Sequence, residues 1–416
     1  MTTLLKKECP FCDESFTTYQ TARRHVLRVH GIPFIARTVR DRNKGFLSFT
    51  DSNVAQYPNA SIAFSCLSCF ETFNDTQQLS SHMMTHISRN APQKPVVPSE
   101  AHRWIVDNQD ISMKFHQFRE RCLQLDKYRL DEHFNELLSA SGILAMRCDV
   151  INEHYSGDSF NPVQLLRIKE ILANFIDDVI NEDKARMQLL DLCETLNDYE
   201  RGVVRAIVGL IPAIYDCNMR PLSEAHFSAS YIHPLMTGLF SCKRPSKVAH
   251  SSNIVADENA TIKNNRPDYK VDVYEAYEYA YTNVYGEIKP TKNISSSLLV
   301  NDFCRVAIFC KDACDELKLD HVIGFQVAGP SITWFGMHLQ QDQLYTFTEI
   351  AAIDIPMKKS ELLNLVGRLD DLMLVVKIHK TLCSPSTTIA NNLRCPTHPL
   401  WYAGTVLKPS PTRSAK

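Results

Sequence analysis

Two short segments near the N-terminus each carry a pair of cysteines followed by a pair of histidines. In both, two residues separate the cysteines, and twelve residues separate the second cysteine from the first histidine. The eight residues are Cys9, Cys12, His25, His30, Cys66, Cys69, His82 and His86. Zinc prefers four nitrogen or sulfur ligands in a tetrahedron, and this spacing supplies two thiolates from a turn and two imidazoles from one helix face. The sequence therefore predicts two structural Zn²⁺ sites.

Large apolar side chains stand where they could close over each metal, which so small a domain needs for a core. In the second segment they are Phe64, Phe73 and Leu79. In the first segment Phe16 fits, but Lys7 replaces the first aromatic residue and Ala22 replaces the leucine. Both segments resemble the C2H2 zinc-finger family. That resemblance implies two small ββα fingers, the first with the weaker core.

The sequence leaves the binding partner of the fingers open. By the resemblance, the helix positions that read bases would be Thr18, Thr21, Arg24, Asp75, Gln78 and Ser81. Only Arg24 is a strong reader of guanine. Thirty-five residues separate His30 from Cys66, so the fingers cannot follow a DNA groove as adjacent fingers do. Residues 1–100 hold eleven Lys or Arg against eight Asp or Glu, a small positive excess. We expect the partner of the fingers to be nucleic acid, either DNA or RNA, or a protein. A further hypothesis is that the protein is a sequence-specific transcription factor.

The composition excludes several classes of protein. With 416 residues the chain has room for two or three domains, and 44% hydrophobic and 22% charged residues are ordinary for globular proteins. A net charge of −2 argues against a protein that binds nucleic acid over its whole surface. Ten of the fourteen cysteines lie outside the fingers, mostly in apolar helical patterns, which favours free thiols in a reducing compartment. No apolar run approaches the roughly eighteen residues of a membrane span, and no apolar leader opens the chain. We expect the nucleus or the cytoplasm, without secretion or membrane insertion.

The chain divides into seven segments, which together predict a multidomain protein. They are a first finger at 1–32, a connector at 33–62, a second finger at 63–90, a Pro-rich linker at 91–102, a helical region at 103–220, an α/β domain at 221–383 and a mostly disordered tail at 384–416. The fold class is therefore two small ββα fingers, an α-helical middle region and a C-terminal α/β domain of α-β-β-α-β order.

Apolar spacing predicts helices beyond the linker. Asn161 followed by a proline is typical of a helix N-cap, and the helix that it opens should bury a face extending to Val179. Further helical segments run from about 185 to 214 and over 223–240, where Pro234 should introduce a kink.

The second half of the chain mixes strands and helices. Residues 241–265 are polar and without periodicity, which predicts a mobile loop. Strand patterns follow at 267–274, 282–289, 322–328, 331–339 and 344–355. A long helix should lie between the second and third of these strands, over 299–317, and a final helix over 358–380.

Acidic residues lie at the ends of two of these strands. Asp268 follows Arg266-Pro267 at the start of one strand, and Glu287 and Lys289 end the next. Side chains alternate along a strand, so Glu287 and Lys289 share a face and Asp268 can join them if the strands pair as a hairpin. Asp268 and Glu287 could then hold Mg²⁺ beside a phosphate, with Lys289 stabilising developing charge. Glu224, on the preceding helix, could add a carboxylate, whereas Asp302 has no motif.

This pattern resembles the PD-(D/E)XK nuclease superfamily over about residues 222–380, and also a group of uncharacterised fungal proteins. Pro267-Asp268 matches the first half of the motif, Glu287-Ile288-Lys289 the second, and Glu224 the acidic residue of the first helix. The resemblance implies a metal-dependent nuclease acting on nucleic acid. The alternative is a non-enzymatic zinc-finger adaptor or regulatory protein with an inactive nuclease-like scaffold.

Overall fold

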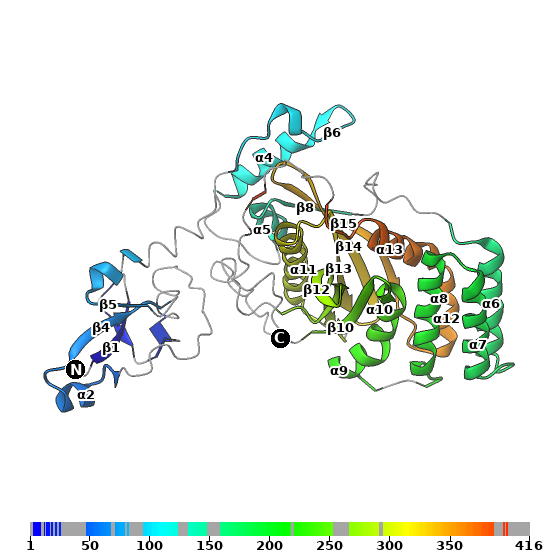
Figure 1. Cartoon of the computed structure of the whole chain (residues 1–416), viewed down its shortest axis with the longest axis horizontal. Helices are drawn as coiled ribbons and strands as arrows, with labels where there is room; N and C mark the ends of the chain where they lie inside the picture. Colours follow the sequence, from blue (N-terminus) through cyan, green and yellow to red (C-terminus); the bar gives the residue numbers. More distant parts are fainter. Residues whose placement is uncertain are drawn as a thin grey trace, which may run out of the picture.

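The computed structural model combines a small N-terminal unit with a larger part in which helices surround an eight-stranded mixed sheet (Figure 1). It describes residues 3–9, 12, 14–16, 18–19, 21–22, 25, 47–67, 71–79, 81–82, 95–123, 132–147, 159–217, 220–252, 266–290, 294–386, 394–395 and 397. The chain is therefore multidomain, with helices and a large mixed sheet, as expected. Within these residues, no helix is both long and apolar enough to cross a membrane.

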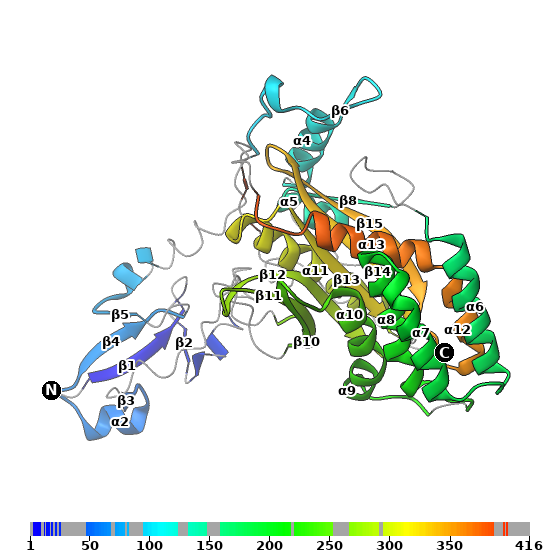
Figure 2. The ribbon, with the colours of Figure 1, turned by 45° about the vertical axis from the view of Figure 1, so that its right-hand side comes forward.

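The N-terminal unit, which we call the finger unit, is built on one small sheet (Figure 2). Its elements are β1 (Thr3–Glu8), β2 (Ser15–Phe16), β3 (Leu47–Ser48), α2 (Asp51–Gln56), β4 (Ser61–Ser65) and β5 (Thr72–Phe73). β1 and β2 form the antiparallel hairpin of the first finger, and β4 and β5 form that of the second. β1 also pairs in parallel with β4, and β3 pairs with β1, so strand hydrogen bonds join the two fingers.

One hydrophobic cluster serves both fingers. Cys9 and Ala22 of the first finger are buried together with Cys66, Leu67 and Leu79 of the second. We expected the first finger to have the weaker core because alanine stands where a leucine is usual. The second finger supplies apolar side chains to that core, and the two fingers form one packing unit.

The segment after the linker contributes to the large sheet. Its elements are a 3₁₀ turn (Glu100–His102), β6 (Ile105–Val106), β7 (Gln109–Asp110), α4 (Ile111–Cys122), α5 (Phe134–Ala140) and β8 (Ile143–Met146). β8 pairs in parallel with β15 (Leu344–Asp354) and becomes an edge strand, which the prediction of a helical region missed. His102 Nδ1 lies 3.0 Å from Asp342 Oδ2, so the end of the Pro-rich linker contacts the sheet.

Three helices then follow, α6 (Pro162–Ile176), α7 (Glu182–Leu192) and α8 (Asp198–Leu210). The predicted cap is confirmed, because the Asn161 side chain accepts hydrogen bonds from the backbone N–H groups of the first turn. The prediction that Val179 is buried is wrong. The helix ends at Ile176, Asp178 takes a positive φ of 58°, and Val179 is 69% exposed beyond this reversal.

The next helix is continuous but irregular. It comprises α9 (Glu224–Phe227), a π turn (Ser228–Ile232) and α10 (His233–Phe240). The π turn ends at Ile232, two residues before Pro234. An irregular helix is expected there because proline has no backbone N–H to donate. The segment predicted as a loop contains the strands β9 (Cys242–Lys243) and β10 (Ser246–Ser251). The prediction was wrong for these residues, because strands near a sheet edge can keep polar side chains in solvent, and residues 253–265 lie outside the described part of the chain.

The large sheet has the order β8-β15-β14-β13-β12-β11-β10-β9. The remaining elements are β11 (Tyr269–Glu275), β12 (Glu278–Lys289), α11 (Ser296–Glu316), β13 (His321–Ala328), β14 (Ser331–Gln341), α12 (Leu362–Val366) and α13 (Leu369–Thr381). The five predicted strands and the long helix are confirmed, whereas the final helix is broken into α12 and α13. β12 and β13 are parallel and joined by α11, while β11 and β12 are antiparallel.

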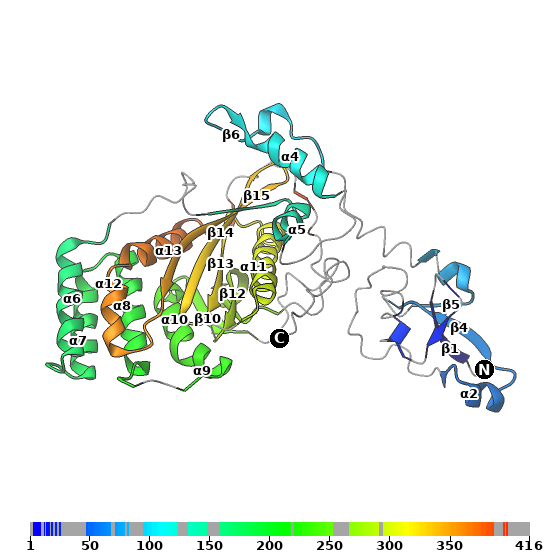
Figure 3. The same cartoon turned by 180° about the vertical axis from the view of Figure 1, so that it is seen from behind.

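Helices cover both faces of the sheet (Figure 3). α6, α7, α8, α10, α12 and α13 share one hydrophobic cluster with one face, and α11 and α5 share another with the opposite face. Of the predicted tail, the structure describes residues 384–386, 394, 395 and 397, some of which contact α11. Arg394 Nη1 lies 2.7 Å from Asp315 Oδ1, and Cys395 is buried and accepts a 2.7 Å hydrogen bond from Lys311 Nζ.

Candidate functional site

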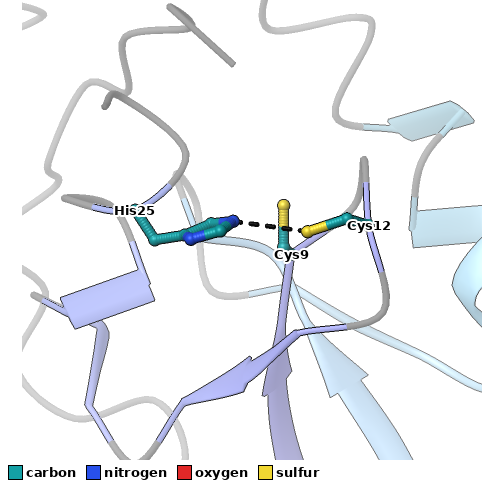
Figure 4. Close-up of side chains that lie close together, drawn as sticks. All are labelled: Cys9, Cys12 and His25. Atoms are coloured by element: carbon teal, nitrogen blue, oxygen red, sulfur yellow. Dashed lines mark hydrogen bonds between the residues drawn. The ribbon is translucent and has the colours of Figure 1, made fainter. Parts of the chain in front are cut away.

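Three of the predicted zinc ligands converge in the first finger (Figure 4). Cys9 follows β1, Cys12 lies in the turn after it, and His25 lies in a helical segment. Their ligand atoms all lie within 4.8 Å of one another, and Cys12 Sγ is 3.3 Å from His25 Nε2. Two thiolates and an imidazole at this spacing are a donor set that zinc prefers, so the cluster fits a zinc site.

A carboxylate orients the first histidine. Glu14 Oε2 lies 3.0 Å from His25 Nδ1, which leaves Nε2 directed toward the cysteines. Such a partner on the second ring nitrogen fixes the tautomer that binds a metal. The Phe16 ring packs on the same imidazole, with the ring centroids 4.9 Å apart.

The second finger repeats part of this geometry, although its Glu71 Oε2 lies 3.7 Å from Nε2 of His82 rather than near Nδ1. The Cys66 N–H donates to Glu71 O at 2.8 Å, as the Cys9 N–H donates to Glu14 O at 2.8 Å. The His82 ring lies 4.6 Å from the Phe73 ring. The predicted ligands Cys69 and His86, and His30 of the first finger, lie outside the described residues.

Several positions that would read bases serve as helix caps. Thr18 Oγ1 accepts a 3.1 Å hydrogen bond from the Thr21 N–H, and Thr21 Oγ1 donates to Thr18 O. Asp75 Oδ1 accepts a 2.7 Å hydrogen bond from the Gln78 N–H. These side chains satisfy backbone groups at the starts of the finger helices. Arg24 lies outside the described residues.

A second group of charged residues lies at one end of the large sheet. Because β11 and β12 are antiparallel, the start of β11 meets the end of β12. The Asp268 N–H donates to Gly286 O at 3.0 Å, and its Oδ2 accepts a 2.8 Å hydrogen bond from the Ile288 N–H. The same oxygen lies 3.4 Å from Lys289 Nζ. Asp268 and Lys289 therefore meet, as the sequence led us to expect.

Helix α11 adds two charged residues that sequence reasoning missed. Arg305 Nη1 lies 2.9 Å from Glu287 Oε2, and Lys289 Nζ lies 3.4 Å from Asp302 Oδ2. Glu287 and Lys289 thus share the face of β12 toward α11, while Ile288 packs in the cluster on the other face. The only sequence signal for this pair was their spacing, because residues three apart on a helix lie on the same face.

The environment of Glu287 and Glu224 disfavours charge on their carboxyls. Glu287 is 0% exposed, its Oε1 has no hydrogen-bond partner among the described residues, and burial raises its pKa to about 9 although Arg305 opposes this. Burial, and then the charge of Asp268, raises the pKa of Glu224, which therefore lies within electrostatic reach. Burial would lower the pKa of Lys289, but the surrounding carboxylates raise it, so its amine stays protonated.

The two clusters differ in spacing and chemistry. Of the described residues, only Cys9, Cys12 and His25 bring three metal-binding atoms within 4.8 Å of one another. The oxygens of the acidic cluster are more widely spread. Such spacing does not suit a closed zinc site.

Comparison with known proteins identifies the N-terminal part. The family model for the C2H2-type zinc finger matches residues 7–95, in two copies. No curated protein and no solved structure was found to match the chain. Residues 7–95 therefore carry C2H2-type zinc fingers, with a cysteine and histidine cluster that fits a zinc site.

Proposed function

We propose that this protein is a nucleic-acid phosphodiesterase with a finger unit that binds two zinc ions. The reaction is Mg²⁺-dependent hydrolysis, and its site is the acidic cluster at the end of β12. The observation that carries the proposal is the ion-pair network of Asp268, Glu287 and Lys289 with α11. From α10 to β13 the order is helix, four strands, helix, strand, so β9 and β10 are additional to the expected α-β-β-α-β order, whose later elements are β11, β12, α11 and β13.

The charge balance of the cluster supports a divalent cation. Four carboxyl groups face two cations, which leaves a net charge of −1 while the buried Glu287 is protonated and −2 once a bound cation ionises it. These residues are Glu224, Asp268, Glu287, Asp302, Lys289 and Arg305. One divalent cation neutralises this charge, and the buried Glu287 Oε1 without a hydrogen-bond partner is available as a ligand. The residues therefore fit Mg²⁺, held by Asp268 and Glu287.

The protein residues then have distinct roles. A divalent cation held at this site would polarise the scissile phosphate and acidify a bound water. Lys289 remains an ammonium and stabilises the charge that develops on the phosphate, rather than acting as a base. The water loses a proton to solvent as its oxygen forms a new bond to phosphorus, the ester P–O bond breaks, and the departing oxygen takes a proton from solvent. Arg305 lies beside Glu287 and adds a second positive charge to this site.

A substitution that keeps the size of the side chain but removes its ionisable group tests the assignment of Glu287. Full-length protein is incubated with single- and double-stranded DNA and RNA in Mg²⁺ or Mn²⁺. Glu287→Gln keeps the size of the buried side chain, and we expect it to lower cleavage at least about 100-fold. Glu278→Gln is the matched control, because Glu278 is exposed at the other end of the same strand. Cleavage by Glu287→Gln at the wild-type rate, or none by wild type, would overturn the proposal.

The second candidate is a non-enzymatic adaptor with an inactive scaffold. The Arg305–Glu287 ion pair at 2.9 Å favours it, because the arginine can neutralise the buried carboxylate without a metal. The capping roles of Thr18 and Asp75 also favour a protein partner over base reading by the fingers. Calorimetric Mg²⁺ binding separates the two candidates, since an adaptor site closed by Arg305 binds no Mg²⁺.

A further inference from the structure

A cavity of about 240 Å³ adjoins the acidic cluster on its α9 side. Pro290, in its wall, directly follows Lys289, and Leu222, also in its wall, lies two residues before Glu224. Pro330 is held beside them because the Gly329 N–H donates to Lys289 O at 2.8 Å. The cavity therefore opens next to the proposed site.

The walls of this cavity combine apolar surface with two cations. Three prolines, together with Leu222, Phe227 and Met357, supply most of the apolar part, and Arg220 and Lys358 supply the charge. No Asp or Glu lines it among the described residues. A bridge to Tyr215 fixes the backbone of Lys358.

Lys358 and Arg220 differ from the neighbouring cation. Lys359 is buried and forms ion pairs with Asp178 and Asp216. Arg220 and Lys358 are exposed, and neither forms an ion pair with a described residue. Two such cations beside apolar side chains suit an anion that carries a flat apolar group. A nucleotide is a molecule of this kind.

We propose that this cavity holds one unpaired nucleotide next to the scissile phosphate. Its phosphate pairs with Arg220 and Lys358, and its base packs on Leu222, Met357 and Pro290. This inference rests on the proposed function and specifies its substrate class. A volume of about 240 Å³ lies below the roughly 300–1,000 Å³ of pockets for drug-sized ligands, so it accepts one base and excludes a base pair. The favoured substrates are therefore single strands and frayed or flapped ends.

Charge reversal of the two cations tests this subsite in full-length protein. The double variant Arg220→Glu with Lys358→Glu is compared with Arg167→Glu, an exposed cation on α6 outside the cavity. We expect KM for a single-stranded oligonucleotide in Mg²⁺ to rise at least tenfold in the double variant, with kcat within about twofold, because the contact is made equally in ground and transition states. The control should match wild type. An unchanged KM, or equal wild-type cleavage of single strands and blunt duplexes, would overturn the inference.

Binding without cleavage separates this inference from the proposed function. Fluorescence anisotropy with the same oligonucleotide is repeated over a range of salt concentrations. Loss of the contact with this one phosphate should make the slope of log K against log salt shallower by about 0.7, the contribution of one phosphate on a single strand. If wild type binds but does not cleave, only the proposed reaction fails. If the double variant binds with the wild-type slope, the subsite fails whether or not cleavage occurs.

Discussion

Leu79→Ala should weaken zinc binding in both fingers, although Leu79 belongs to the second. The side chain is 0% exposed in the cluster that also contains Cys9 and Ala22 of the first finger. Replacing a buried leucine with alanine destabilises a protein by about 2–5 kcal/mol. We take the lower part of this range, about 2–3 kcal/mol, because so small a cluster can collapse around the gap. Metal binding is coupled to folding in zinc fingers. At about 1.4 kcal/mol per tenfold, the loss corresponds to about 30- to 140-fold weaker binding.

The assay is a chelator titration of the full-length protein, followed by native mass spectrometry to count bound zinc ions. In the variant we expect both ions to leave at a lower chelator concentration than in wild type. Ile62→Ala is the control, because Ile62 lies on β4 of the same unit but is 45% exposed. If one ion keeps its wild-type affinity in Leu79→Ala, the fingers are energetically independent and the shared core does not couple them.

Three further predictions concern the large sheet and its helices. The hydrogen bond to Asp272 raises the pKa of His250 above its usual 6.5, so its stabilisation is complete below pH 6.5 and is lost as pH rises through the raised value. The melting temperature of His250→Asn should therefore lie furthest below wild type under pH 6.5, as measured by thermal melts across pH. Gly238→Ala places a methyl group against the backbone of Ala206 and should cost at least about 1–3 kcal/mol in denaturant unfolding. Asn161→Ala removes the cap of α6 and should cost about 0.5–2 kcal/mol in the same assay.

Local patterns carried the successful predictions. The spacing of cysteines and histidines predicted the cluster of Cys9, Cys12 and His25, and the Asn161-Pro162 pair predicted the start of a helix within one residue. Such signals depend on groups that are neighbours along the chain. The pairing of Asp268 with Lys289 was also predictable, because a hairpin of two adjacent strands brings its ends together.

The failures have three different causes. The parallel pairing of β1 with β4, and of β8 with β15, joins segments far apart in sequence, and no local pattern specifies such partners. The strand β10 was missed because its side chains are largely polar. Val179 was misplaced because helical spacing continued past the residue at which the chain reverses.

The difference between local and long-range contacts also explains why Asp302 and Arg305 were not predicted as members of the acidic cluster. Asp302 and Arg305 reach Glu287 and Lys289 only because α11 crosses from β12 to the parallel strand β13 and packs on that face. The other half of α11 is fixed by Lys311, which is fully buried and donates to Asp315 and to Cys395 O, each at 2.7 Å. A helix is stiff along its axis, so this anchor also sets the position of Arg305. Contacts with the tail therefore contribute to holding Arg305 beside Glu287.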